Sequence, residues 1–238
     1  MKAVILAGGR GLRLFEETKN IPKPMVNIGT NPILWHIMKI YSYYGIKDFI
    51  ICAGYKKEII KEYFKKYFNN TEQWKIVIVD TGIKTLTGGR LKRVEKLVSK
   101  EKFFFFTYGD GVSNVNIKKL IKFHIRKKKL VTVTAVKPPG RYGILKIKNS
   151  IVHKFTEKEK GGDGYINGGF FVLSPKALKY IRDDSTVWEE GPMNVLAKKK
   201  QLIAYKHNGF WQSMDTYRDK IQLENSWREK NAGWKIWK

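Results

Sequence analysis

The sequence predicts an α/β protein with a single Rossmann-like, mostly parallel sheet that is flanked by helices. Apolar runs at residues 3–7 and 49–53 each end in a glycine, and a third run at residues 75–80 ends in an aspartate. Lysine-rich amphipathic segments separate these runs, as is typical of parallel strands joined by crossover helices. From residue 131 the pattern changes to alternation with short turns, which predicts a small antiparallel sub-sheet inserted into the parallel core.

The first strand, residues 2–7, ends in a loop rich in glycine and positive charge. The glycines and basic residues of this region are Gly8, Gly9, Gly11, Arg10, Arg13 and Lys23. Glycine lets the backbone approach a ligand closely, and successive amide groups can line an anion site. The spacing fits neither a Walker A loop nor the dinucleotide-binding fingerprint. We interpret the loop as a phosphate-binding loop of another kind, the alternative being a tight turn with three surface cations.

Proline and glycine mark the limits of the next elements. Residues 32–41 have apolar side chains at helical spacing, with Pro32 in the first turn and Gly45 as the stop signal. A strand at 48–53 and an amphipathic helix at 58–68 follow. These elements continue the alternation that a parallel sheet requires.

A Thr-Gly-Gly sequence lies at the start of the third predicted helix. We expect this helix to begin with residues 85–91 and to end at about residue 98. Free amide groups at a helix N-terminus suit a base edge or a phosphate. Thr87, Gly88 and Gly89 are therefore candidate ligand contacts, although an ordinary helix start would look the same.

Two isolated aspartates are candidate metal ligands. Asp110 lies between two glycines after the apolar strand at 102–107, where open α/β sheets bind their ligands. Asp215 follows an aromatic segment and precedes a helix predicted at 217–227. Carboxylates without nearby His or Cys favour Mg²⁺ over zinc. The alternatives are a plain turn at Asp110 and helix capping by Asp215-Thr216.

The antiparallel part begins with strands predicted at 131–136, 144–147 and 151–155, and a return strand at 165–173 leads back to the core. Two glycines after Asn167 in the return strand leave room for a ligand such as a sugar. The remaining predicted elements are a helix at 174–181, a helix at 189–198 and a strand at 202–206.

The composition limits the class of protein. The 238 residues suffice for one domain with a substantial core. The formal net charge of +26 is compatible with nucleic-acid binding, but lysines recur at the predicted helix ends, where they suit the helix dipole and solvent. Cys52 can form no internal disulfide and is predicted to be a core residue. Without an apolar run of membrane-span length or a leader at the start, we expect a soluble, cytoplasmic protein that binds neither nucleic acid nor membrane.

Taken in order, eight segments resemble the sugar-1-phosphate nucleotidyltransferases, and within them most closely the glucose-1-phosphate cytidylyltransferases. The segments are 8–14, 22–25, 32–38, 80–82, 87–91, 108–111, 166–172 and 210–216. Three features depart from the family pattern: Leu12 replaces a threonine, Glu159 replaces a proline, and the segment between Phe68 and Lys75 is short. These departures concern a nucleotide contact, the backbone near the acceptor phosphate, and oligomer contacts.

The resemblance implies the reaction of CTP with a sugar 1-phosphate, glucose 1-phosphate above all, to give a CDP-sugar and pyrophosphate. It also implies Mg²⁺ as cofactor, a homo-oligomer, and a product used for surface polysaccharides such as lipopolysaccharide or capsule. One nucleotidyltransferase domain would span 1–238, with a nucleotide-binding core at 1–130, an acceptor-binding sub-sheet at 131–173, and a C-terminal part at 174–238 that returns to the metal site.

The resemblance assigns roles to individual residues of this chain. The catalytic residues would be Arg13 and Lys23, and the metal ligands Asp110 and Asp215. The nucleotide would contact Leu6, Ala7, Gly8, Gly9, Gly11, Thr87, Gly88, Gly89, Arg90 and Asp110. The acceptor would contact Gly143, Glu157, Lys158 and Asn167.

Three alternatives to this function stay open from the sequence. A nucleic-acid-binding module would explain the charge but would not require glycine-flanked aspartates at strand ends. A non-catalytic nucleotide sensor would keep the first loop without the pair of aspartates, and both are present here. An enzyme that transfers the nucleotide to a non-sugar phosphate, such as a phosphorylated alcohol or amino acid, is the nearest rival.

Overall fold

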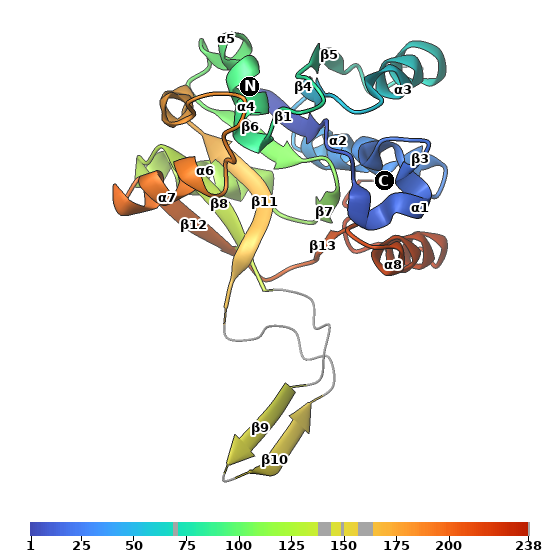
Figure 1. Ribbon diagram of the computed structural model, residues 1–238, viewed down its shortest axis with the longest axis vertical. Coiled ribbons are helices and arrows are strands. Elements are labelled where there is room, and N and C mark those ends of the chain that lie inside the picture. Colours follow the sequence, from blue (N-terminus) through green and yellow to red (C-terminus); the bar gives the residue numbers. More distant parts are fainter. Residues whose placement is uncertain (69–70, 138–143, 149, 157–163, 238) are drawn as a thin grey trace.

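A seven-stranded sheet forms the centre of the computed structural model, which describes residues 1–68, 71–137, 144–148, 150–156 and 164–237 (Figure 1). The strand order is β12-β8-β11-β6-β1-β4-β5. In chain order these strands are β1 (Lys2–Ala7), β4 (Asp48–Ala53), β5 (Lys75–Asp80), β6 (Phe104–Tyr108), β8 (Val131–Val136), β11 (Ile166–Leu173) and β12 (Leu202–His207). Within this sheet only β11 is antiparallel to its neighbours, so the predicted fold class is confirmed.

Helices cover both faces of this sheet. The α-helices are α1 (Phe15–Thr18), α2 (Ile33–Tyr43), α3 (Lys57–Glu62), α4 (Thr87–Arg93), α5 (Glu95–Val98), α6 (Ile117–Lys127), α7 (Gly191–Lys198) and α8 (Tyr217–Arg228). The buried side chains of α2, α6 and α8 join one core cluster, and those of α4, α5 and α7 join another. Because successive side chains of a strand point to opposite faces, Ile5 packs in the first cluster and Val4 in the second.

Three predicted helices differ in detail. The helix expected at 58–68 is α-helical only to Glu62, and a π-helical turn (Tyr63–Tyr67) follows. The helix expected from residue 85 is divided at Val94 into α4 and α5. The segment expected at 174–181 is a 3₁₀ helix (Pro175–Tyr180). Apolar spacing indicates a helical segment but does not distinguish these closely related helix types.

The antiparallel sub-sheet is smaller than predicted. It consists of β9 (Ile144–Lys148) and β10 (Ile151–Thr156), which lie apart from the main sheet in Figure 1. Strand β8, which we expected in the sub-sheet, pairs in the main sheet instead, whereas β11 returns to the core as predicted. All six residues of β8 are buried, because helices cover this region on both faces and its threonines are enclosed with its valines. Alternation of Val and Thr was therefore a misleading sign of a strand in the sub-sheet.

Two further pairs of short strands lie beside the main sheet. They are β7 (Gly111–Ser113) with β13 (Trp211–Ser213), and β2 (Asn27–Ile28) with β3 (Asn31–Pro32). The first pair matters for the site, since it holds the segment after Asp110 against the segment before Asp215.

The strand register brings the ligand loops to one edge of the sheet. Leu6 of β1 pairs with Tyr108 of β6, so the loops after these two strands leave the sheet side by side. Because β11 runs in the opposite direction, its first residues, including Asn167, lie at this same edge. No helix of the described residues is long and apolar enough to cross a membrane.

Candidate active site

A cavity of about 770 Å³ lies beyond the carboxyl ends of β1 and β6, where the topology of an open α/β sheet predicts the ligand site. The predicted residues that line it are Leu6, Ala7, Gly9, Gly11, Arg13, Lys23, Thr87, Arg90, Asp110, Asn167 and Asp215. The predicted acceptor contacts Gly143, Glu157 and Lys158, and the substituted position Glu159, lie outside the described residues. The volume is in the range of small-molecule sites.

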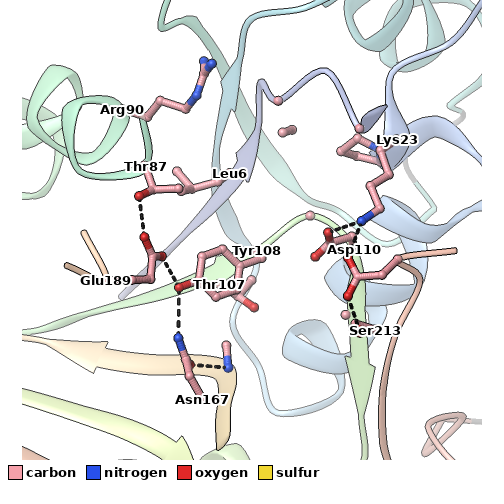
Figure 2. A pocket seen from close by; sticks show the side chains of 18 of the residues that line it. Leu6, Lys23, Thr87, Arg90, Thr107, Tyr108, Asp110, Asn167, Glu189 and Ser213 are labelled. Carbon is pink, nitrogen blue, oxygen red and sulfur yellow. Dashed lines mark hydrogen bonds and ion pairs between the residues drawn. The ribbon is translucent and has the colours of Figure 1, made fainter. Parts of the chain in front are cut away.

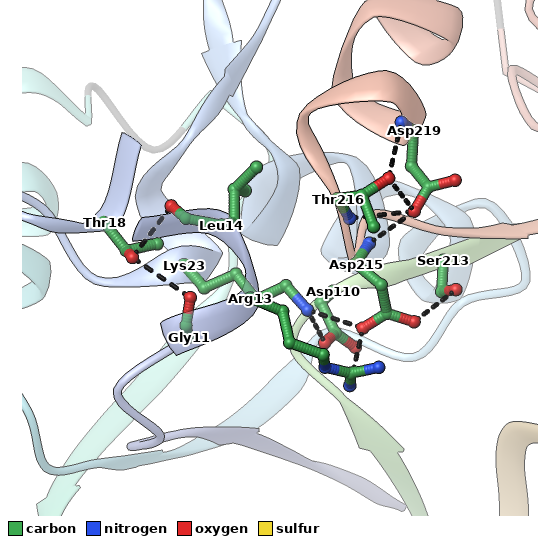
Figure 3. Close-up of polar contacts among 10 residues, drawn as sticks. All are labelled: Gly11, Arg13, Leu14, Thr18, Lys23, Asp110, Ser213, Asp215, Thr216 and Asp219. Carbon is green, nitrogen blue, oxygen red and sulfur yellow. Dashed lines mark hydrogen bonds and ion pairs between the residues drawn. The ribbon is translucent and has the colours of Figure 1, made fainter. Parts of the chain in front are cut away.

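Four charged side chains from distant parts of the chain meet at one end of this cavity (Figure 3). The Lys23 ammonium donates to Asp110 Oδ2 at 2.7 Å and to Asp215 Oδ1 at 2.9 Å. A terminal nitrogen of Arg13 also lies 2.9 Å from Asp215 Oδ1. We call Arg13, Lys23, Asp110 and Asp215 the ion cluster. Its formal charges cancel.

The two cations of the ion cluster differ in their exposure. The Lys23 side chain is 10% exposed, whereas that of Arg13 is 75% exposed. Burial lowers the pKa of Lys23, but Asp110 and Asp215 outweigh it, and the net pKa is raised. Burial likewise raises the pKa of Asp215, but the hydrogen bonds from Lys23 and Ser213 and the charges of Lys23 and Arg13 together outweigh it, and the net pKa is lowered. Lys23 and Asp215 are therefore both charged at neutral pH.

Local structure fixes the backbone on which the two cations stand. Gly11 has φ +66°, a conformation that favours glycine, and it begins the 3₁₀ turn (Leu12–Leu14) that carries Arg13. The Thr18 hydroxyl lies 3.1 Å from the Gly11 carbonyl and 2.9 Å from the Leu14 carbonyl, and so ties this turn to α1. Lys23 opens the 3₁₀ helix Lys23–Met25.

The chain around Asp215 separates helix capping from the ion cluster. Thr216 is the N-cap of α8, and its side chain accepts a hydrogen bond from the Asp219 amide in a capping box. Asp219 Oδ2 accepts from the amides of Asp215 (3.0 Å) and Thr216 (2.8 Å). Of the pair Asp215-Thr216, Thr216 therefore caps the helix as predicted, whereas the Asp215 carboxylate accepts instead from Lys23, Arg13 and the Ser213 hydroxyl.

The two aspartates suit a hard divalent cation. They converge on one positive charge, the Lys23 ammonium, and they offer only oxygen ligands. In the described part of the chain no group of three or more His, Cys, Asp or Glu residues could hold a metal. Mg²⁺ is commonly held by one or two carboxylates, with water and substrate phosphates as further ligands. Asp110 and Asp215 fit that pattern.

At the other end of the cavity a chain of hydrogen bonds joins three elements (Figure 2). The Thr87 hydroxyl of α4 donates to Glu189 Oε2 at 2.6 Å, and the Tyr108 hydroxyl donates to Glu189 Oε1. The Asn167 amide donates to the Tyr108 oxygen at 3.1 Å. We call Thr87, Tyr108, Asn167 and Glu189 the hydrogen-bonded wall. Burial and the charge of Glu189 raise the pKa of Tyr108, which therefore stays a donor.

Sequence reasoning missed Glu189. It stands just before α7, where a carboxylate is common because it favours the positive end of the helix dipole. Glu189 is 81 residues away from Tyr108 along the chain, and the sequence alone offers no sign that its carboxylate lines the same cavity.

Three predicted glycines support the site without lining the cavity. The Gly88 and Gly89 amides donate to the Thr186 carbonyl at 2.9 and 3.3 Å, so the expectation that they are free for a ligand is wrong. A Cβ at Gly89 would lie 2.5 Å from the Asp184 Cα. At Gly8 a Cβ would lie 2.0 Å from the Arg90 guanidinium. Close packing against neighbouring segments requires these glycines.

Arg90 supports the first loop from behind. Its guanidinium is buried and donates to the Thr81 hydroxyl (2.7 Å), the Gly82 carbonyl (2.8 Å) and the Gly8 carbonyl (2.9 Å). Arg90 therefore connects the loop after β1 with the loop after β5, while part of it lines the cavity.

A family model described as nucleotidyl transferase matches residues 2–225, and the chain therefore belongs to the nucleotidyl transferase family. It is 52% identical to glucose-1-phosphate cytidylyltransferase of Salmonella typhimurium over an alignment of 256 positions that covers both chains completely. A probable glucose-1-phosphate cytidylyltransferase of Bacillus subtilis is 43% identical over the same span. The predicted family resemblance is thus confirmed.

Solved structures agree with this assignment. HddC from Yersinia pseudotuberculosis, solved with GMP-PN, has a TM-score of 0.73 and 27% identity, over 95% of this chain and 99% of that one. A UDP-glucose pyrophosphorylase solved with UDP-glucose has a TM-score of 0.72, over 96% and 98% of the two chains. At 18% identity the second likeness shows the fold alone.

Proposed function

We propose that this enzyme joins CTP and glucose 1-phosphate to give CDP-glucose and pyrophosphate. The observation that carries the choice of substrates is the 52% identity, over the whole of both chains, to a glucose-1-phosphate cytidylyltransferase. The ion cluster supports the type of reaction, because it gathers the cations and carboxylates that phosphate chemistry needs at one end of a cavity.

The acceptor phosphate is itself the nucleophile. The second pKa of a phosphomonoester is near 6, so at neutral pH the group is mostly dianionic and needs no general base. One of its oxygens attacks the α-phosphorus of CTP. The bond from the α-phosphorus to the bridging oxygen then breaks, and pyrophosphate leaves with that oxygen. The enzyme contributes in-line positioning and the neutralisation of negative charge.

Arg13 and Lys23 neutralise the triphosphate in this reaction. Lys23 is buried at the cavity wall and lies next to both carboxylates, so it holds a phosphate oxygen at a fixed place. Arg13 is largely exposed and can turn toward the leaving phosphates. Asp110 and Asp215 would hold Mg²⁺, which supplies additional positive charge to the phosphates.

The hydrogen-bonded wall suits the neutral parts of the substrates. Asn167 projects from β11 near the Tyr108 hydroxyl, and the Glu189 carboxylate accepts from two neutral hydroxyl groups. Sugar hydroxyls can donate to such acceptors and accept from the Asn167 amide. We propose that Asn167 contacts the sugar, together with Glu157 and Lys158 for the sugar and its phosphate.

The product and the setting of the reaction complete the proposal. A CDP-sugar serves as a precursor for surface polysaccharides such as lipopolysaccharide or capsule, and the reaction takes place in the cytoplasm, where CTP is made. We also propose a homo-oligomer, which light scattering of the purified protein can test.

Pyrophosphate release across a panel of substrates tests the proposed function. Each of the four nucleoside triphosphates is combined with several sugar 1-phosphates, a phosphorylated alcohol and a phosphorylated amino acid. We expect CTP with glucose 1-phosphate to react fastest, with UTP the nearest competitor because it is also a pyrimidine. Release of pyrophosphate from CTP only with a non-sugar phosphate would contradict the choice of acceptor and leave nucleotidyl transfer in place.

A further inference from the structure

Lys23 occupies the position between the two carboxylates that a divalent cation would need. We propose, on the basis of the function proposed above, that Lys23 competes with the divalent cation for Asp110 and Asp215 until a nucleoside triphosphate binds. The cation and the nucleotide then bind with positive coupling. The nucleotide takes Lys23 from the two carboxylates, and the cation neutralises the carboxylates that repel the nucleotide. Arg13 also competes with the divalent cation for Asp215, but less strongly than Lys23 does.

The distances make the two occupants mutually exclusive. The Lys23 ammonium is within 2.9 Å of a carboxylate oxygen from each aspartate, which is normal hydrogen-bond distance for an ion pair. A divalent ion shared by those same carboxylates would have to take the place of the ammonium. In addition, Arg13 is 2.9 Å from Asp215, so the two negative charges are already balanced by two positive ones.

Burial makes Lys23 the stronger competitor. Arg13 is 75% exposed and can exchange its carboxylate for water at little cost. Lys23 is only 10% exposed, and leaving its ammonium without an anion in the cavity wall would be costly. A metal ion alone therefore displaces Lys23 with difficulty. A triphosphate changes this, because its oxygens provide a new partner for the ammonium.

The same reasoning holds from the side of the nucleotide. Without a metal ion, Asp110 and Asp215 both hold Lys23 and repel the triphosphate. A metal ion on the carboxylates frees Lys23 and replaces repulsion by attraction. Coupling between two ligands is reciprocal. The factor by which the metal ion raises the affinity for the nucleotide therefore equals the factor by which the nucleotide raises the affinity for the metal ion.

Direct binding of Mn²⁺ to the full chain without nucleotide tests the first half. Electron paramagnetic resonance measures free Mn²⁺, which stands in for Mg²⁺. We expect Lys23→Met to bind Mn²⁺ about tenfold more tightly than the wild type, within the usual range of coupling. Arg13→Gln should bind it about twofold to threefold more tightly, as expected for an exposed ion pair. The matched control is Lys39→Met, which removes a 2.6 Å pair with Glu72 outside the cavity and should change nothing.

Calorimetric binding of CTP in EDTA tests the second half, and it does not depend on the Lys23 variant. We expect Asp110→Asn to bind metal-free CTP several-fold more tightly than the wild type, although the same variant should lose activity with Mg²⁺. Glu72→Gln is the control and should bind CTP like the wild type. A structural role for Asp110 alone would weaken binding in both conditions.

Two results would overturn the inference. One is Mn²⁺ binding to Lys23→Met that is no tighter than to the wild type, including no binding to either. The other is metal-free CTP binding to Asp110→Asn that is no tighter than to the wild type. Pyrophosphate release by the wild type reports separately on the proposed function, so a failure of the coupling and a failure of the reaction are distinguishable.

Discussion

The two ends of the cavity use charge in different ways. In the ion cluster, two cations and two anions balance. We propose that these pairs are exchanged for phosphates and a metal ion. In the hydrogen-bonded wall, the Glu189 carboxylate is held by the neutral Thr87 and Tyr108 hydroxyls. Exchangeable charges suit a step in which negative charge moves between phosphate groups. A fixed set of hydrogen-bond donors and acceptors suits the recognition of hydroxyl groups and bases, because a ligand that leaves one of these groups unpaired binds less well.

The largest effect is expected at the buried cation of the ion cluster. Lys23→Ala should lower kcat by about a thousandfold and Arg13→Ala by about a hundredfold, because removal of one charge-stabilising donor usually costs that much. Lys23 should be the more severe change, since solvent cannot replace a buried ammonium as it can an exposed guanidinium. Steady-state pyrophosphate release measures both rates, and circular dichroism controls for folding. Near-normal rates in folded variants would contradict the role of the first loop.

The second effect separates the carboxylate of Asp215 from the helix cap beside it. Asp215→Asn should lower activity by about a hundredfold and raise the Mg²⁺ concentration for half-maximal rate, because an amide keeps the shape but not the charge. Thr216→Ala should cost about 1 kcal/mol of stability and leave the Mg²⁺ dependence unchanged, because it removes the N-cap. The measurements are Mg²⁺ titrations of the rate and urea unfolding. Equal Mg²⁺ dependence in Asp215→Asn and the wild type would remove Asp215 from the metal site.

These two ends also differ in how far the sequence predicted them. Arg13, Lys23, Asp110 and Asp215 could be named because glycine-rich loops and isolated aspartates at strand ends follow a simple rule of α/β sheets. That the four side chains pair with one another depends on the packing of β7 with β13, which no local pattern encodes.

The hydrogen-bonded wall was harder to predict from sequence. Asn167 stands out because glycines follow it, but Glu189 resembles an ordinary helix start. At Gly88 and Gly89 the sequence predicted amides that are free for a ligand. These glycines instead allow close packing of the segment that contains Asp184 and Thr186. The main sheet followed from the apolar runs, except at β8, where the alternating threonines indicated a strand of the sub-sheet. Which face of a segment is covered is a property of the whole fold.

A smaller effect is expected in the hydrogen-bonded wall. Asn167→Ala should raise the KM for glucose 1-phosphate about tenfold, which is the size of one hydrogen bond to a neutral group, and leave CTP binding unchanged. Initial rates at varied glucose 1-phosphate and calorimetric binding of CTP test the two statements. Tyr108→Phe is the companion variant, since it removes the hydroxyl that contacts both Asn167 and Glu189. A weaker affinity for CTP in Asn167→Ala would place the residue at the nucleotide instead.

The smallest effect is expected outside the cavity, at His36 under the C-terminal segment. Its Nε2 lies 2.9 Å from the Ile28 carbonyl, and the Trp234 indole donates to its Nδ1 at 3.3 Å, so the ring is neutral and buried among aromatic side chains. Burial lowers the pKa of His36 to about 4 from its ordinary value of 6.5. Between these two values the unfolded chain binds the proton and the native chain does not. The contribution of His36 to stability therefore falls as pH falls below about 6.5, and this loss levels off below about 4.

Comparison of the wild type with a variant that lacks His36 isolates this contribution. From pH 7 to pH 6 the His36 contribution amounts to about 0.7 kcal/mol of unfolding free energy. In His36→Gln the amide can still donate to the Ile28 carbonyl, but it does not titrate. The unfolding free energy of the variant, measured with urea, should therefore fall by about that much less over this interval than that of the wild type. Because burial also lowers the pKa values of His124 and His207, only the difference between the two pH profiles is informative. Parallel profiles would contradict the assignment of this pH dependence to His36.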